Sequence, residues 1–352
     1  MNFSDFDYRI MKKVHSLALN GKGSVEPNPV VGAVIIKNGT IIGKGYHKKF
    51  GGAHAEIEAI KNCKNSPKNG TIYVNLEPCC FFGKTPACTD ALIKAGIKKV
   101  IISNIDPNTK VNGKGLKILK KAGIEVYKGL MEEEGKKLNE VYFKYISSKI
   151  PFVTLKAALS VNGKIYHKDQ KKYFSSLKSR KFTHKLRSEN QAILVGKNTV
   201  LTDNPHLGAR LFKGKDPIRI ILDSNLQTPL SSKIFRNGKA IIFTKVDKSK
   251  KREEIENKGC SIEVSKSMNI KNILKKVGKI GISNVLVEGG SEIFSSLIKE
   301  NLVDKYIFFL TPNIFPEKDS LTVFSNNQTQ KKLRFANIKK IDKDIYIEAY
   351  NN

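Results

Sequence analysis

Hydrophobic and polar residues in the first part of the chain alternate between helical and strand spacing. After Ser4, which forms a capping-box pattern with Asp7, apolar residues recur every three or four positions and predict an amphipathic helix that ends before Gly21. The Asn38-Gly39 pair between two apolar runs predicts a β-hairpin. Strands are predicted at residues 30–36, 41–45, 71–76, 100–104 and 124–127, and helices at 90–95, 115–121, 131–148 and from 54 onward. This order predicts an α/β sandwich with a largely parallel sheet.

A second pattern begins at Pro151, which disfavours helix in the residue before it. We therefore predict two domains, residues 1–148 and residues 149–352. In the second domain, strands are predicted at 152–159, 192–196, 218–222, 240–244, 262–264, 285–287 and 305–310, with helices near 178–189, 272–279 and 292–299. The charged segment 245–258 is typical of a solvated loop and helix face. The second domain is expected to be α/β as well.

Composition is that of a globular protein, with 40% hydrophobic and 27% charged residues among 352. No apolar run approaches the roughly 18 residues of a membrane span, so no membrane association is expected. The N-terminus lacks the pattern of a secretory signal, which favours the cytoplasm.

The net charge of +31 is the most unusual feature of the composition. Such a charge can indicate a nucleic-acid partner or an anionic substrate. Lysines are scattered along the whole chain and no long arginine-rich tract occurs, so a general compositional bias is the preferred explanation. We expect no nucleic-acid partner.

A candidate zinc site is formed by His54, Cys79 and Cys88. Three of the five cysteines lie within ten residues, which in a reducing compartment indicates metal binding or chemistry more than disulfides. A catalytic zinc takes three protein ligands and leaves its fourth position open. Cys80 is adjacent to Cys79, and neighbouring side chains in extended backbone point in opposite directions, so the two are not expected to bind the same metal. Glu56, two residues after His54, suits the proton shuttle of zinc deaminases.

Two other interpretations of this site stay open. A structural zinc module would need a fourth ligand and would have no deaminase activity. A nucleic-acid base deaminase would have two cysteines one helical turn apart, whereas Cys88 follows Cys79 by nine residues. The loop between them contains Lys84 and Thr85, which suit a phosphorylated small substrate.

The motifs Pro27–Gly32, His54–Glu56, Glu77–Cys79, Gly83–Cys88 and Asp106–Asn108 resemble the deaminase half of the bifunctional riboflavin-biosynthesis deaminase–reductase family. This resemblance implies that Glu56 shuttles protons, and that the zinc ligands are His54, Cys79 and Cys88 and the substrate contacts Asn28, His47, Lys84, Thr85, Asp106 and Asn108. Phe81 stands where the family usually has His. Taken alone, Asn28 also fits a turn before proline, and Asp106 a turn at a strand end.

The second domain contains no G-x-G-x-x-G motif, so a Rossmann dinucleotide site is not indicated. Gly289-Gly290 follows a predicted strand and opens a predicted helix, an arrangement that can bring backbone N–H groups to a phosphate. Taken alone, this glycine pair is better explained by a plain turn. Residues 196–199 and 202–205 also fit turns that follow a strand.

Together, segments of the second domain resemble the reductase half of the same family, and the resemblance covers about residues 5–312. The matching segments are 155–160, 163–164, 186–187, 193–200, 203–210 and 287–290. Departures from the family occur at Asn162, Tyr173 and Gln191. The resemblance implies NADPH contacts from Ala157, Tyr173, Thr199, Gly289 and Gly290, and substrate contacts from Lys156, Arg187, Asp203, Leu207, Arg210 and Glu288. Asp203 is the candidate proton donor, and the two arginines would hold the substrate phosphate.

The whole resemblance implies a cytidine-deaminase-like α/β/α sandwich followed by a dihydrofolate-reductase-like α/β domain. The first domain would use Zn²⁺ to deaminate a diaminopyrimidinone ribosylamine phosphate. The second would use NADPH to reduce the ribosyl chain of the product to ribityl. A chain that keeps the deaminase and has lost the reductase is the remaining alternative. We expect a homo-oligomer that acts on small phosphorylated pyrimidines.

Overall fold

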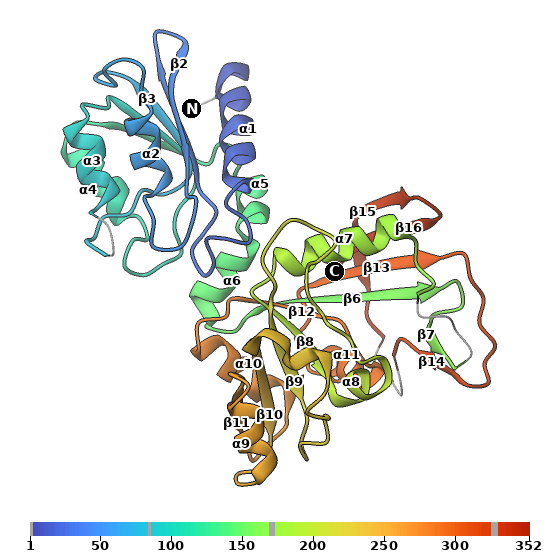
Figure 1. Ribbon diagram of the computed structural model, residues 1–352. Helices are drawn as coiled ribbons and strands as arrows, with labels where there is room; N and C mark the ends of the chain where they lie inside the picture. Colours follow the sequence, from blue (N-terminus) through green and yellow to red (C-terminus); the bar gives the residue numbers. More distant parts are fainter. Residues whose placement is uncertain (1–2, 84–85, 169–172, 325–329) are drawn as a thin grey trace. The chain divides into compact units, whose positions relative to one another are not determined.

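The computed structural model describes residues 3–83, 86–168, 173–324 and 330–352, and the chain forms two compact units, Met1–Lys149 and Ile150–Asn352 (Figure 1). Each unit has its own sheet and its own buried apolar clusters. Within the described residues, no helix has the length and apolar character needed to cross a membrane.

The first unit contains a five-stranded sheet in the order β2-β1-β3-β4-β5. β1 pairs antiparallel with β2 and β3, whereas β3, β4 and β5 run parallel. The strands are β1 (Gly32–Lys37), β2 (Thr40–Tyr46), β3 (Thr71–Leu76), β4 (Lys99–Asn104) and β5 (Glu125–Lys128). The helices are α1 (Asp5–Leu19), α2 (Ala55–Lys61), α3 (Cys88–Lys94), α4 (Lys114–Lys121), α5 (Glu132–Leu138) and α6 (Glu140–Ser148). The predicted hairpin is present, with Asn38 and Gly39 at positive φ in its turn.

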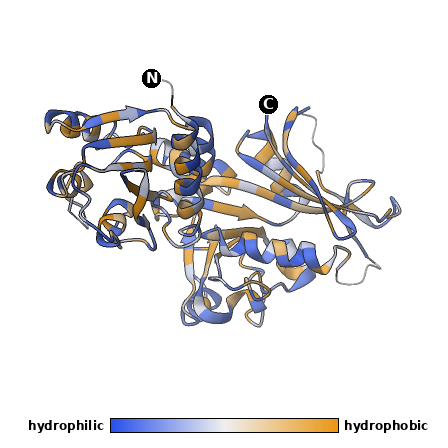
Figure 2. Ribbon diagram, turned by 90° about the horizontal axis from the view of Figure 1, so that it is seen from above, coloured by the Kyte–Doolittle hydropathy of each residue, from blue (hydrophilic) through white to orange (hydrophobic). Residues whose placement is uncertain are grey.

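Side chains alternate between the two faces of this sheet and supply an apolar cluster on each. Figure 2 colours the ribbon by hydropathy and shows hydrophobic residues along the strands. On β1, Ala33 and Ile35 pack with α2, α3 and α4, while Val34 packs against α1. The capping box of α1 is formed, because Ser4 N donates to Asp7 Oδ2 at 2.8 Å and Asp7 N donates to Ser4 Oγ at 3.3 Å. The layers are those of an α/β/α sandwich.

The single helix predicted over 131–148 is two helices in the structure. α5 ends at Leu138 and α6 begins at Glu140, with Asn139 between them at φ −108° and ψ 23°. The buried Asn139 side chain bonds to the backbone of Val30 instead of facing solvent. The bond joins residues far apart in the sequence, whereas helical periodicity depends only on near neighbours. The pattern of residues 131–148 therefore predicts one helix although the structure has two.

The second unit contains a nine-stranded sheet in the order β11-β10-β9-β8-β12-β6-β13-β16-β15. The strands from β11 to β13 run parallel, and β16 and β15 add antiparallel. Its strands are β6 (Phe152–Ser160), β8 (Ala192–Gly196), β9 (Ile218–Leu222), β10 (Ala240–Thr244), β11 (Ser261–Val264), β12 (Asn284–Val287), β13 (Lys305–Thr311), β15 (Leu333–Ile341) and β16 (Asp344–Asn351). β7 (Lys164–His167) and β14 (Ser320–Thr322) form a separate two-stranded sheet. The helices are α7 (Leu177–Ser188), α8 (Lys197–Asp203), η1 (Lys233–Gly238), α9 (Lys250–Glu256), α10 (Ile270–Lys279) and α11 (Ser291–Lys299).

Six elements of the second unit are absent from the sequence prediction: β7, α8, η1, β14, β15 and β16. Residues 197–203 form a helix where a series of turns was predicted. β15 is one of the two edge strands of the large sheet, and its apolar residues do not mark a buried face, because Phe335 and Ile338 remain 59% and 56% exposed. With only one partner strand and few buried side chains, β15 lacks the alternation that identifies a half-buried strand.

Candidate active sites

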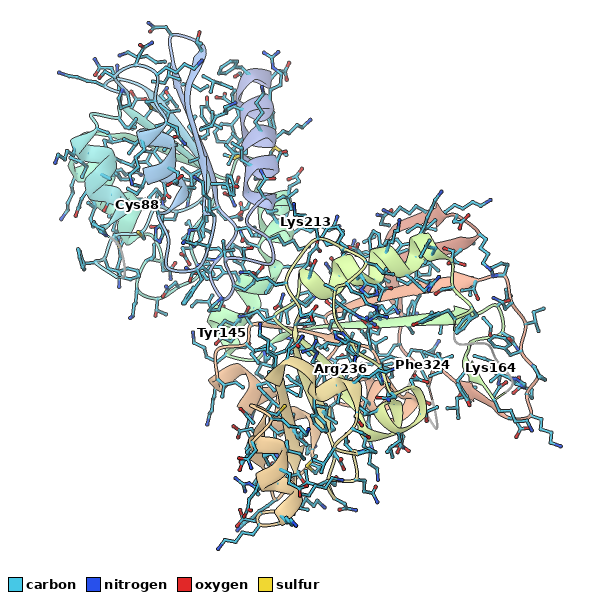
Figure 3. All side chains as sticks on the ribbon, viewed as in Figure 1. Cys88, Tyr145, Lys164, Lys213, Arg236 and Phe324 are labelled. Carbon is cyan, nitrogen blue, oxygen red and sulfur yellow. The ribbon has the colours of Figure 1, made fainter. Side chains whose placement is uncertain are left out.

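Three elements of the first unit bring His54, Cys79 and Cys88 together. His54 is the N-cap of α2, Cys79 follows β3, and Cys88 is the first residue of α3 and is labelled in Figure 3. Their ligand atoms lie within 4.8 Å of one another. His54 Nδ1 is 3.2 Å from Cys88 Sγ and 3.5 Å from Cys79 Sγ. A tetrahedral zinc with bonds of about 2.0 Å to nitrogen and about 2.3 Å to sulfur separates these atoms by roughly 3.5 Å, so the group fits zinc.

The charge state of Cys79 also suits a metal ligand. Hydrogen bonding with Cys88 and with His54 lowers the pKa of Cys79 to about 4, although burial opposes this shift. The backbone N–H of Cys88 donates to Cys79 Sγ at 3.3 Å. A thiolate is the form of cysteine that binds metals. Cys80 instead directs its thiol to the carbonyl of Lys110, 3.7 Å away, and is outside the His54 group.

Glu56 is the buried carboxylate beside this group. It lies in the first turn of α2, is 3% exposed, and lines a cavity of about 410 Å³ together with His54 and Cys79. Burial raises the pKa of Glu56 to about 7. A carboxyl that faces both the metal ligands and the substrate space can carry a proton between them.

Asn28 and His47 form one wall of the same cavity. His47 Nδ1 lies 2.9 Å from the carbonyl oxygen of Ala53, so this nitrogen carries the proton and donates it. Burial lowers the pKa of His47, which favours the neutral ring. Nε2 is then an acceptor for Asn28 Nδ2, 3.3 Å away. The pair holds the Asn28 amide in one orientation toward the cavity.

Asp106 and Asn108 contribute a second wall, at the end of β4. Asp106 Oδ1 accepts hydrogen bonds from the backbone N–H of Asn108 at 2.8 Å and from the Tyr142 hydroxyl at 2.9 Å. Burial raises the pKa of Asp106 to about 6. The hydrogen bonds from Asn108 and Tyr142 hold the carboxyl in a fixed position at the cavity wall.

The deaminase residues predicted from the sequence come together, with two exceptions that lie outside the described residues, Lys84 and Thr85. Phe81, the departure from the family pattern, also lines the cavity. Sequence reasoning missed the wall supplied by α6, where Tyr145 is labelled in Figure 3. These residues share one helical face at positions i, i+3, i+4 and i+7: Tyr142, Tyr145, Ile146 and Lys149. That spacing was the available signal.

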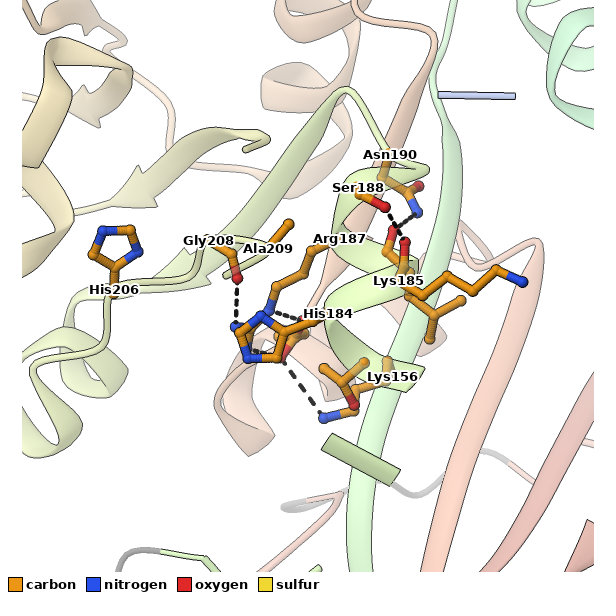
Figure 4. Close-up of polar contacts among 12 residues, drawn as sticks. Lys156, His184, Lys185, Arg187, Ser188, Asn190, His206, Gly208 and Ala209 are labelled. Carbon is orange, nitrogen blue, oxygen red and sulfur yellow. Dashed lines mark hydrogen bonds and ion pairs between the residues drawn. The ribbon is translucent and has the colours of Figure 1, made fainter. Parts of the chain in front are cut away.

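A buried ion cluster joins three elements of the second unit (Figure 4). Arg187 of α7 donates Nε to Glu288 Oε1 at 2.7 Å and Nη2 to Glu288 Oε2 at 2.8 Å. Its Nη1 donates to the carbonyl of Gly208 at 3.2 Å. Lys156 Nζ of β6 lies 3.7 Å from Glu288 Oε2. Although burial raises the pKa of Glu288, the charges of Arg187 and Lys156 hold it at about 2.

Four of the five predicted NADPH residues, all except Tyr173, gather toward the carboxyl ends of neighbouring strands, because β8, β12 and β6 are adjacent in the sheet. Gly289 follows β12, and a Cβ on it would lie 2.7 Å from Thr199 Oγ1 on α8. Gly290 has φ +72° and is the N-cap of α11. Ala157 is buried in β6. A helix N-terminus behind a glycine turn fits the phosphate groups of a dinucleotide.

The other predicted reductase residues differ in how far they are exposed. Asp203 is exposed at the end of α8, and Arg210 is exposed on the following loop. The Leu207 side chain is 4% exposed and belongs to an apolar cluster, so a ligand contact there would come from its backbone. Tyr173 is 49% exposed, with the Arg180 guanidinium 4.5 Å from its ring centroid.

The remaining departures from the family pattern have structural partners. Asn162 accepts a hydrogen bond from Ser160 Oγ at 2.8 Å and donates one to the carbonyl of Phe315 at 2.6 Å. Gln191 Oε1 accepts hydrogen bonds from both the backbone and the hydroxyl of Ser283, at 2.6 and 2.8 Å. Both side chains support loops of the reductase-like unit.

Known proteins resemble this chain over nearly its full length. The sequence profile of the RibD C-terminal domain matches residues 151–347, and that of the cytidine and deoxycytidylate deaminase zinc-binding region matches residues 4–104. The riboflavin biosynthesis protein RibD of Aquifex aeolicus is 42% identical over 97% of this chain and 98% of its own length. That of Actinobacillus pleuropneumoniae is 38% identical over 98% of this chain and 95% of its own length.

Solved structures give the same result. The diaminohydroxyphosphoribosylaminopyrimidine deaminase/5-amino-6-(5-phosphoribosylamino)uracil reductase of Thermotoga maritima matches with a TM-score of 0.90 and 36% identity over 99% of each chain. RibD of Acinetobacter baumannii matches with a TM-score of 0.91 and 32% identity over 99% of each chain.

These comparisons confirm the predicted family, the two-part fold, the deaminase and reductase activities, and the cofactors Zn²⁺ and NADPH. The extent of the resemblance was underestimated, because the match continues past residue 312 to residue 347. The β15–β16 hairpin, which the sequence prediction lacked, lies in that additional stretch. The chain belongs to the RibD family of bifunctional deaminase–reductases of riboflavin biosynthesis.

Proposed function

We propose that the first unit, Met1–Lys149, deaminates diaminohydroxyphosphoribosylaminopyrimidine and that the second unit, Ile150–Asn352, reduces the product, 5-amino-6-(5-phosphoribosylamino)uracil, as the name of the Thermotoga maritima relative describes for that protein. The observation that carries this proposal is one cavity lined by the buried carboxylate Glu56 and by two members, His54 and Cys79, of a zinc-compatible group of three ligands that Cys88 completes. A purely structural zinc would not require a proton carrier at that position.

In the first unit, the ligands of zinc are His54, Cys79 and Cys88. Bound zinc supplies a water of lowered pKa. Glu56 would take a proton from the attacking water and pass it to the amino group, while the water oxygen bonds to the amine-bearing ring carbon and the C–N bond breaks, so that ammonia leaves. Asn28, fixed by His47, and Asp106 orient the pyrimidine ring by hydrogen bonds.

The charges that line the cavity indicate the orientation of the bound substrate. Glu56, Glu77 and Asp106 are carboxylates among the lining residues. Of the described residues around the cavity, Lys149 alone is a lysine or arginine, and its ammonium lies 5.4 Å from the Tyr145 ring centroid. A phosphate is repelled by the carboxylates and attracted to Lys149. The phosphate end of the substrate therefore lies at Lys149, with the ring toward Glu56.

In the second unit, NADPH supplies the hydride that converts the ribosyl chain to ribityl. The start of α11, where Gly289 and Gly290 allow close approach, would hold the phosphates of this cofactor. The substrate is bound beside the ion cluster by Lys156 and Glu288 and by the backbone of Leu207. Two nitrogens of the Arg187 guanidinium already donate to the two carboxylate oxygens of Glu288. The exposed Arg210 is therefore the better candidate for holding the phosphate. Asp203 remains the candidate proton donor.

The chain is further proposed to work in the cytoplasm as a homo-oligomer, on small phosphorylated pyrimidines and without a nucleic-acid partner. Support for an oligomer comes from β15, an edge strand of the large sheet with the exposed apolar residues Phe335 and Ile338. An edge strand of this kind offers N–H and C=O groups to a second copy.

A coupled assay on the full chain tests the proposed function. Supplied with the ribosylated diaminopyrimidine phosphate and NADPH, the protein should release ammonia and then oxidise NADPH. A nucleic-acid base deaminase would release ammonia from DNA or RNA instead. Ammonia release without NADPH oxidation, even when the deaminated intermediate is supplied, would identify a chain that has lost the reductase.

A further inference from the structure

The loop that forms the pyrimidine wall of the first cavity has no strand partner along part of its backbone. Residues 29–31 precede β1 and have no regular secondary structure, yet Asn28 and Val31 on either side of Val30 line the cavity. Backbone N–H and C=O groups that are buried need partners, and a loop without a ladder must find them elsewhere.

Two buried asparagine side chains supply those partners. Val30 N donates to Asn139 Oδ1 at 2.9 Å, and the Val30 carbonyl accepts from Asn139 Nδ2 at 3.0 Å. The same carbonyl accepts from Asn75 Nδ2 at 2.9 Å, while Gly32 N donates to Asn75 Oδ1 at 2.8 Å. Each side-chain amide thus accepts a hydrogen bond from one backbone N–H of the loop and donates one to the Val30 carbonyl. A neighbouring strand would pair with the loop backbone in the same way. Asn75 is 0% exposed and Asn139 is 3% exposed.

The two amides come from elements that serve the cavity in other ways. Asn75 lies in β3, four residues before Cys79. Asn139 occupies the break between α5 and α6, and α6 supplies the wall that contains Tyr142 and Lys149. Asn139 bonds to the Val30 backbone from the break between the two helices, so one side chain joins the α6 wall to the loop.

We propose that Asn75 and Asn139 are positioning residues of the deaminase, acting through Val30 to hold Asn28 and Val31 against the substrate ring. This inference rests on the proposed function of the first unit. Neither side chain lines the cavity, so neither touches the substrate. Loss of either amide donor removes one of the two hydrogen bonds to the Val30 carbonyl, which loosens the loop and weakens substrate binding more than it slows the chemical step at Glu56.

The test is deaminase kinetics of full-length Asn139→Asp. The change keeps size and the acceptor for Val30 N–H, but removes the donor to the Val30 carbonyl. Loss of one buried hydrogen bond of this type corresponds to a rise in KM of ~10-fold, with a smaller fall in kcat. Asn75→Asp, which leaves the α5–α6 break untouched, should raise KM in the same way. Asn62→Asp is the matched control, because it removes an exposed bond to the carbonyl of Lys44 in the same unit.

Zinc content and NADPH oxidation are measured on the same preparations. Both should equal the wild-type values in each variant, which shows that the units are folded. An unchanged deaminase KM in both variants, or loss of zinc together with loss of activity, would overturn the positioning role. If the wild type itself releases no ammonia, the proposed function fails instead, and the two failures are thereby distinguished.

Discussion

At the scale of single residues, the chain divides into side chains that react and side chains that hold others in place. Glu56 is the clearest member of the first group, since it is buried in the cavity beside the three ligand residues. Glu288 belongs to the second group in part, because its two oxygens are occupied by Arg187 at 2.7 and 2.8 Å. Different measurements therefore report on the two carboxylates.

Replacement of Glu56 by Gln should abolish deamination without removing the metal. The amide keeps the size of the side chain but cannot take up a proton, and loss of a positioned acid–base group lowers a rate by about 10²–10⁴-fold. Ammonia release measures the effect. Zinc content and NADPH oxidation with the deaminated intermediate are the controls and should be unchanged. Near-normal ammonia release would exclude Glu56 as the proton carrier.

Replacement of Glu288 by Gln should destabilise the second unit, because it leaves Arg187 and Lys156 buried without their counter-charge. Removing one partner of a buried pair costs about 3–5 kcal/mol of unfolding free energy. Urea denaturation of wild type and variant measures the difference. A variant as stable as the wild type at neutral pH would show that the cluster is not a stabilising pair.

The ion pair between Glu288 and Arg187 also predicts how the stability of the second unit depends on pH. The pKa of Glu288 is raised by burial but is held at about 2 by Arg187 and Lys156, below its ordinary value of 4.5. A carboxylate with a depressed folded-state pKa stabilises the fold above its unfolded pKa, and this contribution is lost as pH falls toward the folded value. The stability difference between wild type and Glu288→Gln should therefore shrink between about pH 4.5 and 2. A difference that stays constant over this window would contradict the assigned charge state.

At the scale of elements, local patterns predicted most of the fold. The capping box of α1 and the Asn38-Gly39 hairpin depend on neighbours in sequence, and both formed as predicted. The break at Asn139 and the edge strand β15 depend on partners far away in the chain, so periodicity could not reveal them. In the candidate site, sequence motifs identified the zinc-ligand residues. The cavity residues of the α6 wall were missed, although their helical spacing can be seen in the sequence.

The α6 wall leads to a prediction for substrate affinity. Lys149→Met should raise the deaminase KM by about 10-fold, because a charge-assisted bond to phosphate contributes about 1.5–3 kcal/mol. Lys144→Met is the matched control on the same helix, since Lys144 is not among the cavity residues. Steady-state kinetics with the phosphorylated substrate and with its dephosphorylated form complete the comparison. Equal effects on both substrates would place the phosphate elsewhere.

At the scale of the whole molecule, two compact units with separate cores correspond to two chemistries in one chain. The residues proposed for each activity lie within one unit, from Asn28 to Lys149 for deamination and from Lys156 to Gly290 for reduction. Damage to one site should therefore leave the other working. This independence makes each activity an internal control for variants of the other.

The most direct test of the account is metal analysis combined with both activities on the full-length protein. The account predicts about one zinc per chain, ammonia release that is lost after chelation and restored by added zinc, and NADPH oxidation with the deaminated intermediate that persists throughout. Ammonia release that continues at an equal rate in the zinc-free protein would contradict the central claim.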